Sequence, residues 1–128
     1  MVKVVVDSSV LIEEERKGSK LYWKMVKKAK EGKIKILIPT VVIAELWMDR
    51  SMDKKTVFEG MEKRISPFER VSVDEEVARK AGEIGRKGEV WGFDAVIAAS
   101  CLVNRASLIT LNKKHFSKIK GLKFYEAL

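Results

Sequence analysis

The sequence is poor in the residues that build disulfides, zinc sites and phosphate-binding loops. It contains one cysteine and one histidine in 128 residues, so Cys101 has no partner for an internal disulfide and no Cys/His cluster indicates zinc. No Gly-rich phosphate loop is present. No charge-free apolar run approaches the ~20 residues that span a membrane, and the first residues lack the pattern of a signal peptide. We therefore expect a cytoplasmic protein without a membrane partner.

Basic residues outnumber acidic ones. The chain has 26 Lys and Arg against 18 Asp and Glu, which gives a formal net charge of +8 and a pI of about 9.6. This excess favours polyanionic partners, nucleic acid first. The basic residues are spread along the chain, mostly in pairs, a pattern that is also typical of a solvated surface. The length predicts a single domain, residues 1–128.

Apolar runs alternate with amphipathic segments along the chain. Strands that alternate with helices predict a parallel sheet with right-handed crossovers. The expected fold class is α/β, a three-layer α/β/α sandwich with a short, mostly parallel sheet of four or five strands. The expected strands are 2–6, 34–38, 69–72, 107–110 and 122–125; the expected helices are 8–16, 19–31, 40–50, 53–65, 94–103 and 112–119, and one more opened by the capping-box spacing of Ser72 and Glu75.

Three carboxylates stand in apolar surroundings, where an unpaired charge is costly. Asp7 directly follows the β-branched run 2–6, so it lies at the carboxyl end of a buried strand, the edge where ligands bind in open α/β sheets. Glu45 lies inside a helix on a largely apolar face, and Asp94 opens the most apolar helix of the chain. We expect the three carboxylates to converge closely enough to share a cation or its waters.

Each candidate residue also has a purely structural interpretation. Asp7 and Asp94 are both suited to cap the helices that follow them, and Glu45 would either be satisfied by a buried Lys or Arg or lie at the edge of the core. Asn112, which follows a strand, is either a helix cap or a polar wall of the same pocket. His115 is interpreted as a packed or surface residue rather than as a catalytic base.

The chemistry of the acidic cluster points to a divalent cation. Carboxylate oxygens without His or Cys select hard cations such as Mg²⁺ or Mn²⁺. Such a cation activates a water molecule and polarises a phosphoryl oxygen. Together with a basic surface that attracts nucleic acid, the cluster predicts hydrolysis of phosphodiester bonds. Ser8 and Ser9 lack a plausible His–Asp partnership, so a serine hydrolase is not expected.

Five segments are characteristic when they are taken in order. They are 4–12, 43–46, 73–78, 94–99 and 108–116. This series, which runs over essentially the whole chain, resembles the PIN domain family, in particular the VapC-type ribonuclease toxins. The resemblance implies a PIN-like fold and a Mg²⁺- or Mn²⁺-dependent endoribonuclease that cleaves RNA as the toxin of a toxin–antitoxin pair.

The resemblance also implies roles for individual residues. The metal ligands of the family carry over to Asp7 and Asp94, and Glu45 completes the acidic cluster on which catalysis depends. The hydroxyl of Ser8 or Ser9 would not bind the metal itself but would hold these ligands in position.

One position departs from the family pattern. The family often has a fourth acidic residue in the segment where Asn112 stands here, so this site has one negative charge fewer, although an amide can still bind a water or a metal through its carbonyl. The resemblance further implies two protein partners, a small antitoxin that blocks the site and a second copy of the chain in a homodimer.

Two alternative functions stay open at this point. A non-catalytic RNA-binding or scaffold PIN domain is favoured slightly by Asn112 and opposed by the three intact carboxylates. A phosphotransfer domain that uses Asp7 as phosphoacceptor would usually have further acidic residues beside the first strand, and the segment 7–9 lacks them.

Overall fold

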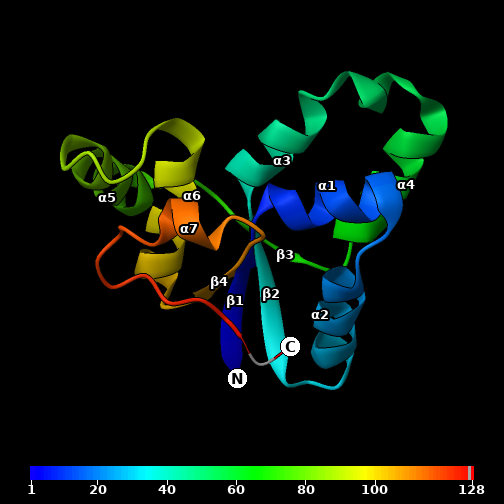
Figure 1. The fold of residues 1–128 in the computed structure, drawn as a ribbon, viewed down its shortest axis with the longest axis horizontal. Coiled ribbons are helices and arrows are strands. Elements are labelled where there is room, and N and C mark those ends of the chain that lie inside the picture. Colours follow the sequence, from blue (N-terminus) through cyan, green and yellow to red (C-terminus); the bar gives the residue numbers. More distant parts are fainter. Residues whose placement is uncertain (127) are drawn as a thin grey trace.

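A parallel sheet forms the centre of the molecule (Figure 1). The computed structural model describes residues 1–126 and 128, and in this part of the chain the sheet has four strands in the order β3–β2–β1–β4. All neighbouring strands are parallel. β1 takes an inner place because its valines suit a strand that is covered on both faces. The strands are β1 (Val2–Val6), β2 (Ile34–Pro39), β3 (Glu69–Val71) and β4 (Ser107–Ile109).

Helices cover both faces of this sheet. Figure 1 shows α1, α2 and α4 on one side and α5, α6 and α7 on the other, while α3 extends from the end of β2. The expected three-layer α/β/α arrangement is therefore confirmed. The helices are α1 (Ser8–Lys17), α2 (Lys20–Lys30), α3 (Thr40–Trp47), α4 (Lys55–Ile65), α5 (Glu75–Arg86), α6 (Gly92–Asn104) and α7 (Lys113–Phe116), and a 3-10 turn, Arg50–Asp53, joins α3 to α4.

The core lies where the sheet meets these two helical layers. Val4, Val5 and Val6 of β1 are fully buried, as are the inward residues of α6, which is why that helix has an almost wholly apolar sequence. This packing fixes the ends of β1 and α6 relative to each other. It thereby determines where the polar residues that follow β1 and those that begin α6 can meet.

The strand expected at 122–125 does not form within the described residues. This segment makes one isolated bridge, between Leu108 and Phe124. The bridge is held by hydrogen bonds from Leu108 N to the carbonyl of Lys123 (2.8 Å) and from Tyr125 N to the carbonyl of Leu108 (2.9 Å). β4 has only three residues, so it offers too short an edge for a longer ladder. The prediction of this last strand was wrong.

Two helix termini also differ from the expectation. α5 is capped by Asp74, whose Oδ1 accepts a hydrogen bond from Val77 N (2.9 Å), and not by Ser72. Asp74 directly precedes the helix, so it reaches the unpaired amides of the first turn better than a residue two positions earlier. The helix expected at 112–119 is shorter, because α7 ends at Phe116 and continues as turns.

Across the described residues, no helix is long and apolar enough to cross a membrane.

The single cysteine, Cys101, is buried in α6. Burial, together with the negative charge of Asp7, raises the pKa of its thiol. A buried thiol whose pKa is raised is a poor nucleophile.

Candidate metal and active site

The carboxyl ends of β1 and β4 bring two polar residues together. Asp7 directly follows β1, and Thr110 directly follows β4. The two strands are neighbours, and a further ladder bond joins Asp7 N to the carbonyl of Ile109 (3.0 Å). The side chains of Asp7 and Thr110 therefore meet at the edge of the sheet where parallel α/β folds bind ligands.

Asp7 is almost completely buried, with 3% of its surface exposed. Its Oδ2 accepts hydrogen bonds from the hydroxyls of Ser9 (2.8 Å) and Thr110 (2.7 Å). Asp7 occupies the N-cap position of α1, but its side chain makes no capping hydrogen bond there. The helix-cap interpretation is therefore wrong for this side chain, and both hydroxyls direct their protons to one oxygen of the carboxylate.

The two hydroxyls are themselves held in place by backbone amides. Ser9 Oγ accepts a hydrogen bond from Leu111 N (3.1 Å), and Thr110 Oγ1 accepts one from Asn112 N (3.0 Å). Each amide occupies a lone pair of the hydroxyl, so the hydroxyl proton is free to point at Asp7. This network fixes the orientation of the carboxylate, as supporting groups do around metal ligands.

Glu45 lies on α3 with an unpartnered oxygen. Its Oε1 is buried and has no hydrogen-bond partner among the described residues. The pKa of Glu45 is raised from 4.5 to about 7, first by burial and then by the negative charges of Asp7 and Asp94, while the Ser8 hydroxyl acts in the opposite direction. The expected alternative, a buried Lys or Arg, is not what faces this carboxylate. Instead, Glu45 faces the other two predicted acidic residues.

Asp94 lies in the first turn of α6, not at its cap. The N-cap of this helix is Trp91, so the alternative interpretation of Asp94 as a helix cap is wrong. Oδ2 of Asp94 is 2.7 Å from Nε2 of His115. An ionised carboxylate only accepts hydrogen bonds, so the imidazole N–H is the donor. The contact ties α7 to the beginning of α6.

The three carboxylates form an open acidic cluster. They are close enough for Asp7 and Asp94 to raise the pKa of Glu45. In the part of the chain that the structure describes, however, no three Asp, Glu, His or Cys side chains are arranged to hold one metal ion. The donor set nevertheless suits a hard cation, because it consists of carboxylate oxygens and one of them is buried without a partner. Sharing of a cation through its water molecules agrees with both observations.

Asn112 is exposed and precedes α7, but its side chain makes no capping hydrogen bond. It lines a groove of about 650 Å³ together with His115 and Trp91. Its backbone N–H supports Thr110, as described above. The helix-cap role is therefore wrong for this side chain, and its role as a polar wall of the pocket that holds the carboxylates stays a prediction.

Sequence reasoning missed two contacts of the acidic residues. Thr110 was not singled out, although a hydroxyl at the carboxyl end of the strand beside β1 is a usable signal. His115 was interpreted as a packed or surface residue. It does pack edge-on against Phe116, with ring centroids 5.5 Å apart, but it also contacts Asp94. No local pattern indicates that contact, because the two residues are separated by 21 positions.

The PIN domain family model matches residues 4–122 of the chain. No curated protein matches the sequence. The matched region contains all three carboxylates of the acidic cluster and also the segment with Asn112 and His115.

Several solved structures share the fold. VapBC2 from Rickettsia felis, bound to a promoter DNA fragment, aligns with a TM-score of 0.82 and 23% identity over 97% of this chain and 98% of that one. DNA-bound VapBC from Salmonella typhimurium gives a TM-score of 0.82 and 21% identity over 98% of both chains. PAE2754 from Pyrobaculum aerophilum gives 0.61 and 26% over 94% of this chain and 87% of that one. The PIN-like α/β/α fold is thus confirmed.

Proposed function

Because this chain belongs to the PIN domain family, we propose that it is a metal-dependent endoribonuclease that hydrolyses RNA phosphodiester bonds. The observation that carries the proposal is the buried, unpartnered Oε1 of Glu45, which faces Asp7 and Asp94. A like-charge cluster of this kind is costly in a folded protein unless a cation neutralises it. PIN domains are nucleases, and an acidic cation site is the means by which this fold can cleave a phosphodiester.

The residues of the site have distinct parts in this proposal. Asp7, Glu45 and Asp94 would hold Mg²⁺ or Mn²⁺, which when bound supplies an activated water and neutralises charge at the phosphate. Ser9 and Thr110 keep Asp7 oriented through their hydrogen bonds to Oδ2. These bonds leave Oδ1 without a hydrogen bond from any described residue, so this oxygen is free to face a cation.

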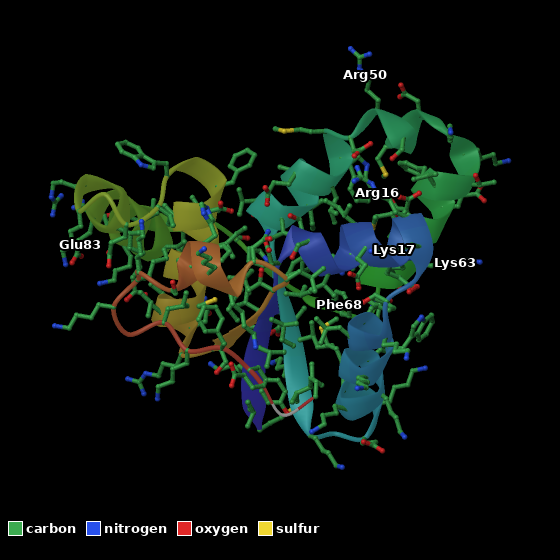
Figure 2. The ribbon with its side chains drawn as sticks, in the orientation of Figure 1. Arg16, Lys17, Arg50, Lys63, Phe68 and Glu83 are labelled. Atoms are coloured by element: carbon green, nitrogen blue, oxygen red, sulfur yellow. The ribbon has the colours of Figure 1, made fainter. Side chains whose placement is uncertain are left out.

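The charge of the protein supports an RNA substrate. With a net charge of +8, the surface attracts polyanions. Figure 2 shows Arg16, Lys17 and Lys63 around α1 and α4, with Arg50 reaching outward from the turn after α3, while the acidic Glu83 lies at the opposite end, on α5. Cationic side chains therefore flank α1, the helix that begins directly after Asp7.

A role in a toxin–antitoxin pair is part of the proposal. The structures from Rickettsia felis and Salmonella typhimurium are VapBC complexes with DNA, and the chain aligned here covers 98% of each of those chains. We infer that this chain has a small antitoxin partner that covers the acidic cluster, and that it forms a homodimer. Mixing with the protein encoded next to it, followed by measurement of mass in solution, tests both inferences.

A cleavage assay tests the proposed activity. A labelled RNA is incubated with the protein in Mn²⁺ and, in parallel, in EDTA; cleavage in Mn²⁺ alone is expected. Asp7→Asn keeps the volume of the side chain and removes its charge, so it is expected to abolish cleavage. Asp53→Asn is the matched control, because Asp53 is exposed in the 3-10 turn, and it should cleave like the parent.

The same assay separates the proposal from the alternative of a non-catalytic RNA-binding domain. The neutral side chain of Asn112, where the family often has an acidic residue, is the feature that favours the alternative. RNA that is bound but left intact in Mn²⁺ would support the alternative. Cleavage by Asp7→Asn at the parental rate would refute the assignment of Asp7.

A further inference from the structure

A groove runs beside the acidic cluster and is not part of it. Its walls come from two segments, the loop that joins α5 to α6 and the segment 111–118 around α7. Its volume is about 650 Å³. His115 lines it and at the same time contacts Asp94, so the groove begins one hydrogen bond away from a proposed metal ligand.

Trp91 is the most unusual residue of this groove. Its side chain is 76% exposed, and within the described residues it stacks on no other ring and makes no capping hydrogen bond for α6. Trp23, the other highly exposed tryptophan at 58%, has structural partners: its Nε1 donates to Glu14 (3.1 Å), and its ring lies edge-on to Tyr22 at 5.1 Å. Packing therefore accounts for Trp23 and leaves Trp91 unexplained.

The backbone has an unusual conformation directly after Trp91. Gly92, the next residue, has φ +57°, a conformation that side-chain-bearing residues rarely adopt. A Cβ at this position would meet no atom within 4 Å, so the glycine serves the backbone conformation and not close packing. The chain thus turns sharply between Trp91 and α6.

Two lysines of the groove are free to bind anions. Lys114 and Lys118 both line it and are exposed, and neither forms an ion pair in the described part of the chain. Lys113, by contrast, is paired with Glu126 at 3.0 Å. The acidic residue in the groove, Glu89, already accepts a hydrogen bond from Lys120 N at 3.1 Å. The groove therefore combines a free aromatic face with two unpaired cations.

We propose that this groove binds single-stranded RNA next to the cleavage site, with a base stacked on Trp91 and backbone phosphates at Lys114 and Lys118. The proposal rests on the proposed ribonuclease function and adds a substrate class to it. Aromatic platforms beside cationic side chains are how proteins hold unpaired nucleotides. A base inside a duplex already stacks on its neighbours, so Trp91 selects a strand whose bases can be splayed out. The unpaired lysines favour this polyanion over an apolar peptide.

Binding is measured on the full-length chain in EDTA, with a short fluorescently labelled single-stranded RNA. Loss of a stacked base predicts that Trp91→Ala weakens binding by roughly 5- to 150-fold. Trp91→Phe keeps an aromatic face and should retain most of the affinity. Trp23→Ala is the matched control and should bind like the parent. Thermal unfolding of each variant verifies that it is folded.

Salt dependence tests the lysines separately. Each lysine that neutralises a phosphate should contribute about 0.7 to the slope of log affinity against log salt concentration. Lys114→Ala and Lys118→Ala should each lower the slope by that amount. Lys113→Ala, whose lysine is paired with Glu126, should leave it unchanged.

Specific results would overturn the groove proposal. Trp91→Ala that binds the RNA as the parent does would overturn it, as would equally tight binding of a duplex of the same sequence. If Trp91→Ala lost binding to an antitoxin peptide but bound RNA with the affinity of the parent, Trp91 would belong to a protein interface instead. These readouts need neither metal nor cleavage, so they are independent of the Mn²⁺ assay. A parent that never cleaves RNA but needs Trp91 to bind it would refute the hydrolase and support the groove.

Discussion

The hydroxyl of Thr110 donates a hydrogen bond of 2.7 Å to Oδ2 of Asp7, across 103 positions of the sequence. The same hydroxyl accepts a hydrogen bond from Asn112 N over 3.0 Å. Thr110 thus joins a buried carboxylate after β1 to the segment that leads from β4 into α7. It is a positioning residue: it donates a hydrogen bond to one oxygen of the proposed metal ligand and, among the described hydrogen bonds, touches no other part of the cluster's carboxylates.

Replacement of Thr110 by valine tests this role. Thr110→Val keeps the shape of the side chain and removes the donor, so the orientation of Asp7 loosens. Mn²⁺ affinity, measured by calorimetric titration, is expected to fall by about 10- to 100-fold, as for other groups that support metal ligands. Thr110→Ser retains the hydroxyl and should stay within a few-fold of the parent. Equal affinities for Thr110→Val and Thr110→Ser would show that the hydrogen bond is irrelevant to the site.

Glu45 predicts an unusual pH dependence of stability. Its pKa is about 7 in the folded chain against an ordinary 4.5, so between these values the folded state holds a proton that the unfolded state has released. The contribution of Glu45 to the free energy of unfolding therefore decreases as pH rises from 4.5 through 7. Denaturant titrations of the metal-free protein should show this decrease, and Glu45→Gln should flatten it. A decrease of the same size in Glu45→Gln would assign the effect to other groups.

Metal binding should stabilise the fold because it relieves the repulsion within the cluster. At Mn²⁺ concentrations about a hundredfold above the dissociation constant, linkage gives about 2.7 kcal/mol of added stability. Thermal unfolding with and without Mn²⁺ measures the gain. Asp94→Asn should lose most of it, and Asp53→Asn should keep it. If saturating Mn²⁺ did not change the unfolding midpoint of the parent protein, this result would contradict a metal site formed by these carboxylates.

The sequence predicts the centre of this fold well and its periphery less well. The run 2–6 reads as a buried strand because it is continuously β-branched, and β1 forms there. The segment 122–125 has a similar apolar content, yet it forms only a bridge to Leu108. Whether a segment like this extends a sheet depends on the length of the neighbouring strand, which is a property of the tertiary structure and not of the segment.

In the candidate site, too, some features can be predicted from the local sequence and others cannot. The sequence predicts Asp7, Glu45 and Asp94 as candidates because a carboxylate in an apolar context is costly, and that cost is visible in the local sequence. The contacts of Thr110 with Asp7 and of His115 with Asp94 join residues 103 and 21 positions apart. A single sequence contains no local signal for such pairs. α6 begins at Gly92, whose φ is +57°, so Asp94 lies in the first turn of the helix and not at its cap.

Asn112 provides the most direct test of how charge sets the strength of the site. Its backbone N–H donates a hydrogen bond to Thr110, and the Thr110 hydroxyl donates one to Asp7. The backbone of Asn112 is therefore linked to the acidic cluster by two successive hydrogen bonds. Asn112→Asp adds a negative charge there at almost constant volume. Coulomb attraction at this range, in partly solvated surroundings, corresponds to about tenfold tighter Mn²⁺ binding or more, measured by calorimetric titration. Asn112→Ala removes the amide without adding charge, so it separates charge from the loss of a neutral ligand. If Asn112→Asp binds Mn²⁺ no more tightly than Asn112→Ala does, the side chain at position 112 lies outside the electrostatic reach of the metal, and the groove it lines serves the substrate alone.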